Sequence, residues 1–392
     1  MGHLKDRDVL RRALALASLA VLVAGCARAG RGDETSLPST VAVTQDMPAT
    51  DVPEAPVPTP TEAVAPPAVA TAGLTFSTAE GLWLIDRAGA AGLVVDSAQA
   101  RVSPDGTKVA FLMQDPTSGD DDVWLLDRAT GERTNLTHTT DRFETVPMWW
   151  PGRPDVVVFG SDLGIGMENA DYPTMVGLDG GGYQVLDPNL GGPRALAPDG
   201  SAIAYGGYEA PGAIYRWGSG IEPFNPTDFG ISAEKLFQPA WSPDGRQLAW
   251  LVGGDLEGQG TYRSGLAVFD LGAKAGSLMH VFAPAGGGTF PQDVIWSPDG
   301  TWIAFVTFGE APATGRAPNL WVIHPDGSGE TYVGEGLNPV WSPDGAHLAY
   351  LRTGADGAQE IWMAETGSWH AEQLNLPDEA RRTLFLMGWV QP

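Results

Sequence analysis

The sequence predicts an all-β domain built from repeated small sheets, and three observations carry this prediction. The pentapeptide Trp-Ser-Pro-Asp-Gly occurs three times, starting at Trp241, Trp296 and Trp341. Each copy is followed by a short apolar run in which an alanine precedes an aromatic residue. The chain holds 51 Gly and 32 Pro among 392 residues, and only 18% of its residues are charged. This composition suits many short strands joined by turns and argues against a helical bundle.

Each Pro-Asp-Gly segment predicts a tight turn between two strands. Pro presets φ at the second turn position, Asp is tolerated at the third, and Gly accepts the left-handed conformation that closes the turn. Divergent copies start at Val102, Trp149 and Leu196. The six serine-equivalent positions are separated by 47, 47, 45, 55 and 45 residues. A repeat of this length in a β-rich chain is typical of a β-propeller, whose blades are four-stranded sheets.

A second strand signal in each repeat predicts seven blades. Seven such segments occur, at residues 82–86, 123–127, 175–179, 213–217, 266–270, 320–324 and 361–365. The first repeat lacks the strand that would precede its hairpin, and residues 384–390 at the C-terminus form a strand without a following hairpin. We expect the C-terminal strand to complete the first blade, because this closure removes an unpaired sheet edge. Six blades are the alternative, if the divergent region 143–190 forms none.

The N-terminal region predicts export and a lipid anchor. Residues 1–12 carry four basic side chains, residues 13–25 are apolar, and the run ends in Leu-Val-Ala-Gly-Cys26. A basic region, a short apolar region and small residues at the cleavage point indicate a secretory signal peptide over residues 1–25. The ending resembles a bacterial lipobox, which implies cleavage before Cys26 and a lipid on this residue. An uncleaved anchor or a plain signal peptide is the alternative.

Residues 26–72 predict a linker between the lipidated Cys26 and a propeller domain at residues 73–392. The segment 27–72 contains eight Pro, seven Thr and no aromatic residue. Such a segment cannot bury enough apolar surface to offset the entropy of ordering, and its prolines favour extended polyproline II. We interpret it as a disordered stalk that holds the domain off the membrane. A disordered tail without a mechanical role is the alternative.

The repeats resemble the WD40-like repeats of the TolB propeller family, whose hallmark is this pentapeptide followed by the apolar run. The resemblance covers about 320 residues. It implies a propeller fold, which in this family serves periplasmic binding proteins, surface lipoproteins and the gating domains of prolyl-oligopeptidase-like enzymes. The chain departs from TolB itself, since a lipobox and a linker replace the α/β N-terminal domain and seven blades replace six. The envelope-division role of TolB is therefore not expected here.

The search for catalytic chemistry predicts no catalytic residue. The sequence contains no Gly-x-Ser-x-Gly, which excludes a hydrolase nucleophile elbow. Its six histidines show no metal-ligand spacing, and its single cysteine excludes an internal disulfide. A formal charge of −25 disfavours nucleic acid and anionic membrane surfaces as direct partners. We expect no resident cofactor and no metal site, and membrane contact only through the lipid on Cys26.

Clustered carboxylates leave one weak metal hypothesis. Asp120, Asp121 and Asp122 lie in a polar loop of the second blade, and Ca²⁺ favours loop oxygens. The spacing of an EF-hand is absent, so a solvated acidic loop is the alternative.

The ligand site is expected where the loops enter the innermost strands, at the mouth of the central channel. Polar residues stand three positions before the motif aromatic in four blades, with two more nearby in others; the set is Gln99, Glu144, Arg194, Gln238, Asp293 and Asn338. Their hydration of the channel without a ligand is the alternative.

These observations predict a lipid-anchored extracytoplasmic propeller, at the cell surface or in the periplasm, that is not an enzyme. It would be monomeric and would bind a protein, peptide or glycan of the cell envelope. The alternative is a lyase- or lactonase-like propeller enzyme with a metal or acidic site at the channel mouth. Converging histidines or carboxylates would favour the enzyme, and a mixture of amides and hydrophobic residues would favour binding.

Overall fold

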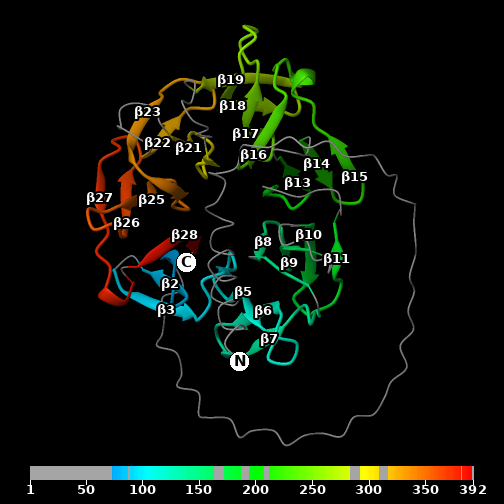
Figure 1. The fold of residues 1–392 in the computed structure, drawn as a ribbon, viewed down its shortest axis with the longest axis vertical. Coiled ribbons are helices and arrows are strands. Elements are labelled where there is room, and N and C mark those ends of the chain that lie inside the picture. The colour runs from blue at the N-terminus through cyan, green and yellow to red at the C-terminus, as the bar shows by residue number, and fades with distance from the viewer. Residues whose placement is uncertain are drawn as a thin grey trace, which may run out of the picture. The chain divides into compact units, whose positions relative to one another are not determined.

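The computed structural model describes ten segments of the chain, all within the predicted propeller domain. These are residues 73–86, 89–140, 142–145, 147–162, 172–186, 194–206, 212–282, 292–308, 317–380 and 382–390. They form seven antiparallel sheets of four strands each, which follow one another around a common centre (Figure 1). The predicted signal peptide, Cys26 and the linker lie outside the described segments. Within these segments, no helix is long and apolar enough to span a membrane.

Blade 1 joins the two ends of the described chain. It consists of β28 (Thr383–Val390), β1 (Gly73–Thr78), β2 (Leu82–Ile85) and β3 (Ala91–Val95) in that spatial order. The pairing of β28 with β1 extends from Gly73 opposite Val390 to Thr78 opposite Thr383. The predicted closure of the first blade by the C-terminal strand is confirmed.

The other six blades each use four consecutive strands. The bounds are, for blade 2, β4 (Ala100–Val102), β5 (Lys108–Gln114), β6 (Asp121–Asp127) and β7 (Arg133–Asn135); for blade 3, β8 (Met148–Trp150), β9 (Arg153–Ser161), β10 (Tyr172–Gly177) and β11 (Gln184–Val185); for blade 4, β12 (Arg194–Leu196), β13 (Ala202–Tyr205), β14 (Ala213–Arg216) and β15 (Gly220–Pro223); for blade 5, β16 (Lys235–Trp241), β17 (Gln247–Gly254), β18 (Arg263–Asp270) and β19 (Ala275–Val281); for blade 6, β20 (Gln292–Trp296), β21 (Ile303–Phe308), β22 (Pro318–Ile323) and β23 (Thr331–Glu335); and for blade 7, β24 (Leu337–Trp341), β25 (His347–Thr353), β26 (Gln359–Glu365) and β27 (Ala371–Gln373).

The divergent region 143–190 forms blade 3, which decides between the two predicted blade numbers. The seven-bladed propeller is confirmed, and the six-bladed alternative is wrong. Two short 3-10 helices, η1 (Pro226–Phe229) and η2 (Asp378–Ala380), lie in the connections that follow β15 and β27. The first strand of each blade lies nearest the centre of the ring, as β8, β16 and β28 show (Figure 1).

The motif turns have the geometry that their residues predict. In blade 5 the Ser242 hydroxyl donates to Asp244 Oδ1 at 2.6 Å and accepts from the Gln247 backbone N–H at 2.9 Å. The same pair of hydrogen bonds recurs in blades 2, 6 and 7. The turn glycine has a φ of +68° in blade 5, in the left-handed region that Gly adopts without strain. The predicted hairpin turn is therefore locked by the Ser and Asp side chains as well as by its backbone.

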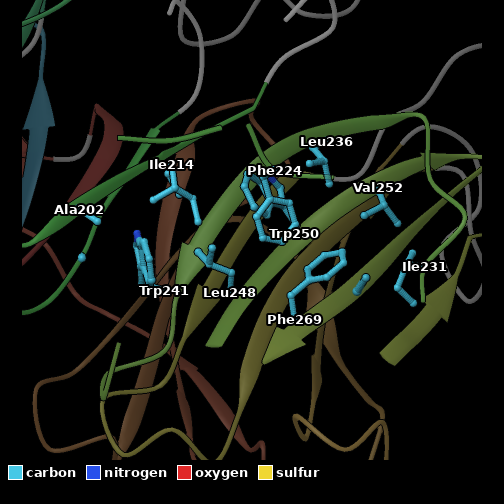
Figure 2. Packing of buried hydrophobic residues seen from close by; sticks show 13 residues of the cluster. Ala202, Ile214, Phe224, Ile231, Leu236, Trp241, Leu248, Trp250, Val252 and Phe269 are labelled. Atoms are coloured by element: carbon cyan, nitrogen blue, oxygen red, sulfur yellow. The ribbon is translucent and has the colours of Figure 1, made fainter. Parts of the chain in front are cut away.

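Each sheet buries its faces against its neighbours. Between blades 4 and 5 the indoles of Trp241 and Trp250 pack with Phe224, Phe269 and Leu248 into one apolar cluster (Figure 2). The alanine of each apolar run is fully buried, as in Ala249, and its small side chain lets adjacent sheets approach closely. The motif tryptophans are core residues, since Trp241, Trp296 and Trp341 are only 8–9% exposed.

The motif tryptophans also bond one blade to the blade before it. Trp241 Nε1 donates to the carbonyl of Ala195 at 3.0 Å, and Trp296 Nε1 donates to the carbonyl of Ala240 at 3.0 Å. In both pairs the acceptor is the residue directly before the motif position of the preceding blade, which is Leu196 in blade 4 and Trp241 in blade 5. Trp341 packs in the same way, but its Nε1 has no hydrogen-bond partner among the described residues. The indole N–H is therefore used as an inter-blade bond at some repeats and not at others.

This difference gives a matched pair of variants. Trp241→Phe removes the bond to Ala195 and leaves a carbonyl without its partner, whereas Trp341→Phe removes an N–H that makes no bond. We expect Trp241→Phe to lower the free energy of unfolding by about 1 kcal/mol more than Trp341→Phe, since a net hydrogen bond contributes roughly this amount. Urea unfolding followed by tryptophan fluorescence and circular dichroism measures both. Equal losses in the two variants would contradict the inter-blade bond.

Candidate functional site

Three of the predicted ligand residues lie at the same point of successive innermost strands. Gln238, Asp293 and Asn338 belong to β16, β20 and β24, and each stands three residues before a motif tryptophan. The pairing of each strand with its neighbour is interrupted here, which identifies a β-bulge. Asp293 and Asn338 have φ values of +57° and +51°, a region that Asp and Asn tolerate better than most residues. The bulge explains why short polar side chains occupy these positions.

The three side chains form a continuous relay from blade to blade. The Asp293 backbone N–H donates to Gln238 Oε1 at 2.6 Å, and the Asn338 N–H donates to Asp293 Oδ2 at 3.0 Å. The N–H of Leu386, three residues before Trp389 in blade 1, donates to Asn338 Oδ1 at 2.5 Å. We call Gln238, Asp293 and Asn338 the inner-strand arc. It bonds blades 5, 6, 7 and 1 to one another at the leading ends of their first strands.

Each side chain of the arc has a second polar atom that the relay does not use. All three residues are partly exposed, and the relay uses one oxygen of each. Among the described residues, Gln238 Nε2, Asp293 Oδ1 and Asn338 Nδ2 have no hydrogen-bond partner. Burial raises the pKa of Asp293, and the Asn338 N–H opposes this shift. The arc therefore presents an amide donor, a carboxyl oxygen and a second amide donor in a row.

Gln99 and Arg194 lie outside the relay, three and two residues before the motif positions of blades 2 and 4. Gln99 stands three residues before the motif position of blade 2, and its N–H donates to Ser97 Oγ at 3.3 Å. The side chain at this position in the preceding blade is Leu386, which has no acceptor to offer. Arg194 is the first residue of β12 and is partly exposed. Ligand contact at either residue stays a prediction.

Glu144 lies between blades 2 and 3, where its carboxyl group is buried. Its Oε2 accepts from the Val123 N–H and from Thr137 Oγ1, both at 2.9 Å. Its Oε1 lies 3.1 Å from Thr139 Oγ1. Burial raises its pKa to about 7, although the threonine hydrogen bonds act in the opposite direction. The described contacts give Glu144 a structural role, and its use by a ligand stays a prediction.

A proton count is in line with the raised pKa of Glu144. The Thr139 hydroxyl lies 3.0 Å from Asp122 Oδ1 as well as 3.1 Å from Glu144 Oε1, but it has one proton to donate. Asp122 is fully buried and also accepts from Asn135 Nδ2 at 2.6 Å. All contacts are satisfied when Glu144 carries a proton that it donates to Thr139 Oγ1, while Thr139 donates to Asp122. The nearby Asp122 charge raises the pKa of Glu144 in the same direction.

The three weak calcium candidates do not face one another. Asp121 and Asp122 are successive residues of β6, so their side chains point to opposite faces of the sheet. Asp121 is exposed, whereas Asp122 is buried in the network with Glu144 and Asn135. Asp120 lies in the turn before the strand. Over the described segments, no three His, Cys, Asp or Glu side chains are grouped as metal ligands would be.

Sequence reasoning missed three residues that matter for these contacts. Leu386 could have been found, because it stands three residues before Trp389 just as Asn338 does before Trp341. Thr139 carried no signal, since its partners are set by the packing of blade 2 on blade 3. Arg101 stands directly before the motif position of blade 2, where other blades have apolar residues.

Comparisons with known proteins support the fold. No protein-family model matches the sequence, and no curated protein matches it. Among solved structures, the tricorn protease is 14% identical over 78% of this chain and 33% of its own, with a TM-score of 0.52. A prolyl endopeptidase is 16% identical over 76% of this chain and 46% of its own, with a TM-score of 0.53. TolB from Acinetobacter baumannii is 15% identical over 81% of each chain, with a TM-score of 0.46.

The likenesses to the tricorn protease and to the prolyl endopeptidase show the propeller fold and nothing finer. The chain spans a third of the tricorn protease and less than half of the prolyl endopeptidase. Since one fold hosts many unrelated activities, function has to be argued from the chain's own residues.

The raised pKa of Glu144 predicts how the stability of the protein changes with pH. Its pKa is about 7 in the folded protein and near 4.5 in the unfolded chain, so the folded state binds more protons between these values. The contribution of Glu144 to stability is therefore present below pH 4.5 and is lost as pH rises to about 7. Glu144→Gln keeps the neutral form at every pH. Over this pH range we expect the free energy of unfolding of the variant to fall by up to ~3 kcal/mol less than that of the wild type.

Urea unfolding at pH 5.0 and pH 7.5 measures the effect as the difference between wild type and variant. Glu132→Gln, which neutralises an exposed carboxylate in blade 2, is the matched control and should keep the wild-type dependence. An unchanged slope in Glu144→Gln would show that Glu144 is ionised in the folded protein.

Proposed function

We propose that this protein is a non-enzymatic binding module of the cell envelope, anchored by a lipid on Cys26. The observation that carries the proposal is the inner-strand arc of Gln238, Asp293 and Asn338. In this proposal the arc binds a protein, peptide or glycan at the leading ends of the innermost strands. The following contacts support this proposal.

The composition of the arc favours binding over catalysis. Two amides flank one carboxyl group, and the apolar Leu386 follows them in blade 1. A catalytic pair would need two titratable groups at a distance at which one acts as acid and the other as base. A row of donor, acceptor and donor instead matches the alternating groups of a peptide backbone or of sugar hydroxyls. The arc thus has the mixture that favours recognition.

The arc is also fixed before any ligand arrives. Each of its side chains is oriented by a hydrogen bond from the next blade, and Asp293 and Asn338 are further constrained by the bulge. A rigid polar row loses little conformational entropy when it binds, which increases affinity without additional contact area.

The anchor and the localisation are proposed from the sequence. Residues 1–25 have the pattern of a signal peptide, Cys26 ends a lipobox, and residues 27–72 form a linker rich in Pro and Thr. At about 3.1 Å per residue, a fully extended linker could reach on the order of 140 Å. It would hold the propeller clear of the membrane and let the arc meet its ligand.

A double exchange tests the arc without breaking the relay. Asp293→Asn with Asn338→Asp keeps an acceptor oxygen at both positions and conserves net charge, but it exchanges the outward donor and acceptor. We expect at least a tenfold loss of affinity for the envelope component that the full-length protein captures, because mispaired polar groups remain in the complex. The melting temperature should change by no more than a few degrees.

The ligand is identified by cross-linking in envelope preparations, and its affinity is then measured for wild type, the double exchange and Gln373→Ala. Gln373 is exposed on the outer strand β27, so this variant should bind like wild type. Unchanged affinity in the double exchange would rule out the arc as the binding site.

Cys26→Ser tests the anchor. We expect wild type in the membrane fraction, with the mass of a lipidated chain that begins at Cys26. The variant should lose the lipid and leave the membrane fraction, since no other residue could carry the modification. Cell fractionation and intact-mass spectrometry measure this; the same distribution and mass shift in both proteins would contradict the lipobox.

A further inference from the structure

In six of the seven innermost strands the residue directly before the motif position is apolar, and in blade 2 it is an arginine. Arg101 is the middle residue of β4, directly before the motif position Val102. Its backbone carbonyl accepts from Trp149 Nε1 at 2.9 Å, so the strand around it is fixed to blade 3. Its guanidinium reaches Met387 of β28, the innermost strand of blade 1, with 2.7 Å between NH1 and Sδ. The side chain thus crosses between the innermost strands of two adjacent blades.

The equivalent position is apolar in every other blade. The residues are Met148, Ala195, Ala240, Ile295, Val340 and Gly388. Packing between blades therefore does not require a charge at this level, and Arg101 is the exception that needs an explanation.

The guanidinium has few partners among the described residues. NH1 donates to the carbonyl of Ala100 at 3.1 Å and to the weakly accepting sulfur of Met387. No ion pair formed by the described residues includes Arg101. Burial lowers its pKa to about 10, which leaves it charged at neutral pH. A partly buried guanidinium with no anion among the described residues loses hydration without gaining an ion pair, so its donors call for an explanation.

We propose that Arg101 anchors the carboxylate at the end of an extended chain, such as a peptide C-terminus, that enters past the inner-strand arc. The guanidinium fork binds a carboxylate through two parallel hydrogen bonds. Arg101 is partly exposed, so an entering group can reach it. The inference rests on the proposed binding function and specifies its ligand.

The spacing along the strands fits a short segment of chain. The arc occupies the position three residues before the motif aromatic, and Arg101 the position one residue before it. Two residues of strand correspond to about 7 Å along the innermost strands. One or two residues of an extended peptide span this depth, with backbone groups facing the amides of the arc and the terminal carboxylate facing Arg101.

The first experiment measures the unliganded protein. Arg101→Met keeps the aliphatic stem and removes the unpaired charge, so the full-length variant should melt ~2–5 °C higher than wild type. A lower melting temperature would show that the guanidinium stabilises the fold through its own contacts, and would overturn the inference.

The second experiment uses pools of N-acetylated tripeptides, one with free C-terminal carboxylates and one with the same sequences amidated. Full-length wild type should retain peptides from the free-acid pool at least tenfold more than from the amide pool. Arg101→Gln should abolish this preference, and Arg101→Lys should keep part of it because a charge remains without the fork. Arg246→Gln, which removes an exposed arginine of a motif turn, is the matched control.

Equal retention of both pools, or retention of neither, overturns the carboxylate anchor. Retention that responds to the Asp293→Asn, Asn338→Asp exchange but not to Arg101→Gln overturns the anchor and leaves the proposed binding function standing. Loss of preference in Arg246→Gln as well would show a general effect of charge and would also overturn the anchor.

Discussion

The bond between one innermost strand and the next is the constraint on which the rest of this propeller depends. A four-stranded sheet has two apolar faces and cannot bury either by itself. The motif tryptophans fill the space between neighbouring sheets, and their indole N–H groups reach back to the previous blade in blades 3, 5 and 6. The arc adds a second set of bonds at the leading ends of the same strands. Closure through β28 and β1 completes the ring, because the last blade then meets the first.

The positions that hold the ring together are also the positions where the repeats differ. Three residues before the motif aromatic, Gln238, Asp293 and Asn338 bond to the next blade, whereas Leu386 ends the relay. One residue before it, apolar side chains line the strands and Arg101 is the exception. Uniform repeats would give a stable ring without a site. The departures from the repeat are the positions at which we propose that a ligand is recognised.

Two ionisable groups between blades differ in how their charge is compensated. Burial and the nearby Asp122 charge raise the pKa of Glu144 to about 7, and a proton on Glu144 leaves the Thr139 hydroxyl free to donate to Asp122. Arg101 stays charged and is met only by a carbonyl oxygen and a sulfur atom. The first arrangement is internally complete and serves the interface of blades 2 and 3. Arg101 has no anion among the described residues. For this reason we propose a ligand for Arg101 and a structural role for Glu144.

The sequence by itself determined the features that recur within each repeat. Pro, Asp and Gly define the motif turns, the alanine and the tryptophan define the packed faces, and the unmatched strand at 384–390 defines the closure. The turn is local, so one copy of the motif contains the residues that its geometry needs, and the closure could be predicted because the first repeat lacks a strand and one strand is left over at the C-terminal end of the repeat array. The sequence also predicted the positions of the arc, because its residues stand three positions before the motif tryptophans.

Only the tertiary structure decided which groups meet across blades. The partner of Asp293 is 55 residues away in Gln238, and Leu386 meets Asn338 over 48 residues. The sequence placed Glu144 near the channel mouth but could not give its partners, and the packing of blade 3 on blade 2 brings its carboxyl group to Val123, Thr137 and Thr139. A repeat pattern specifies the shape of each blade, whereas contacts between blades depend on how two separately formed sheets come together.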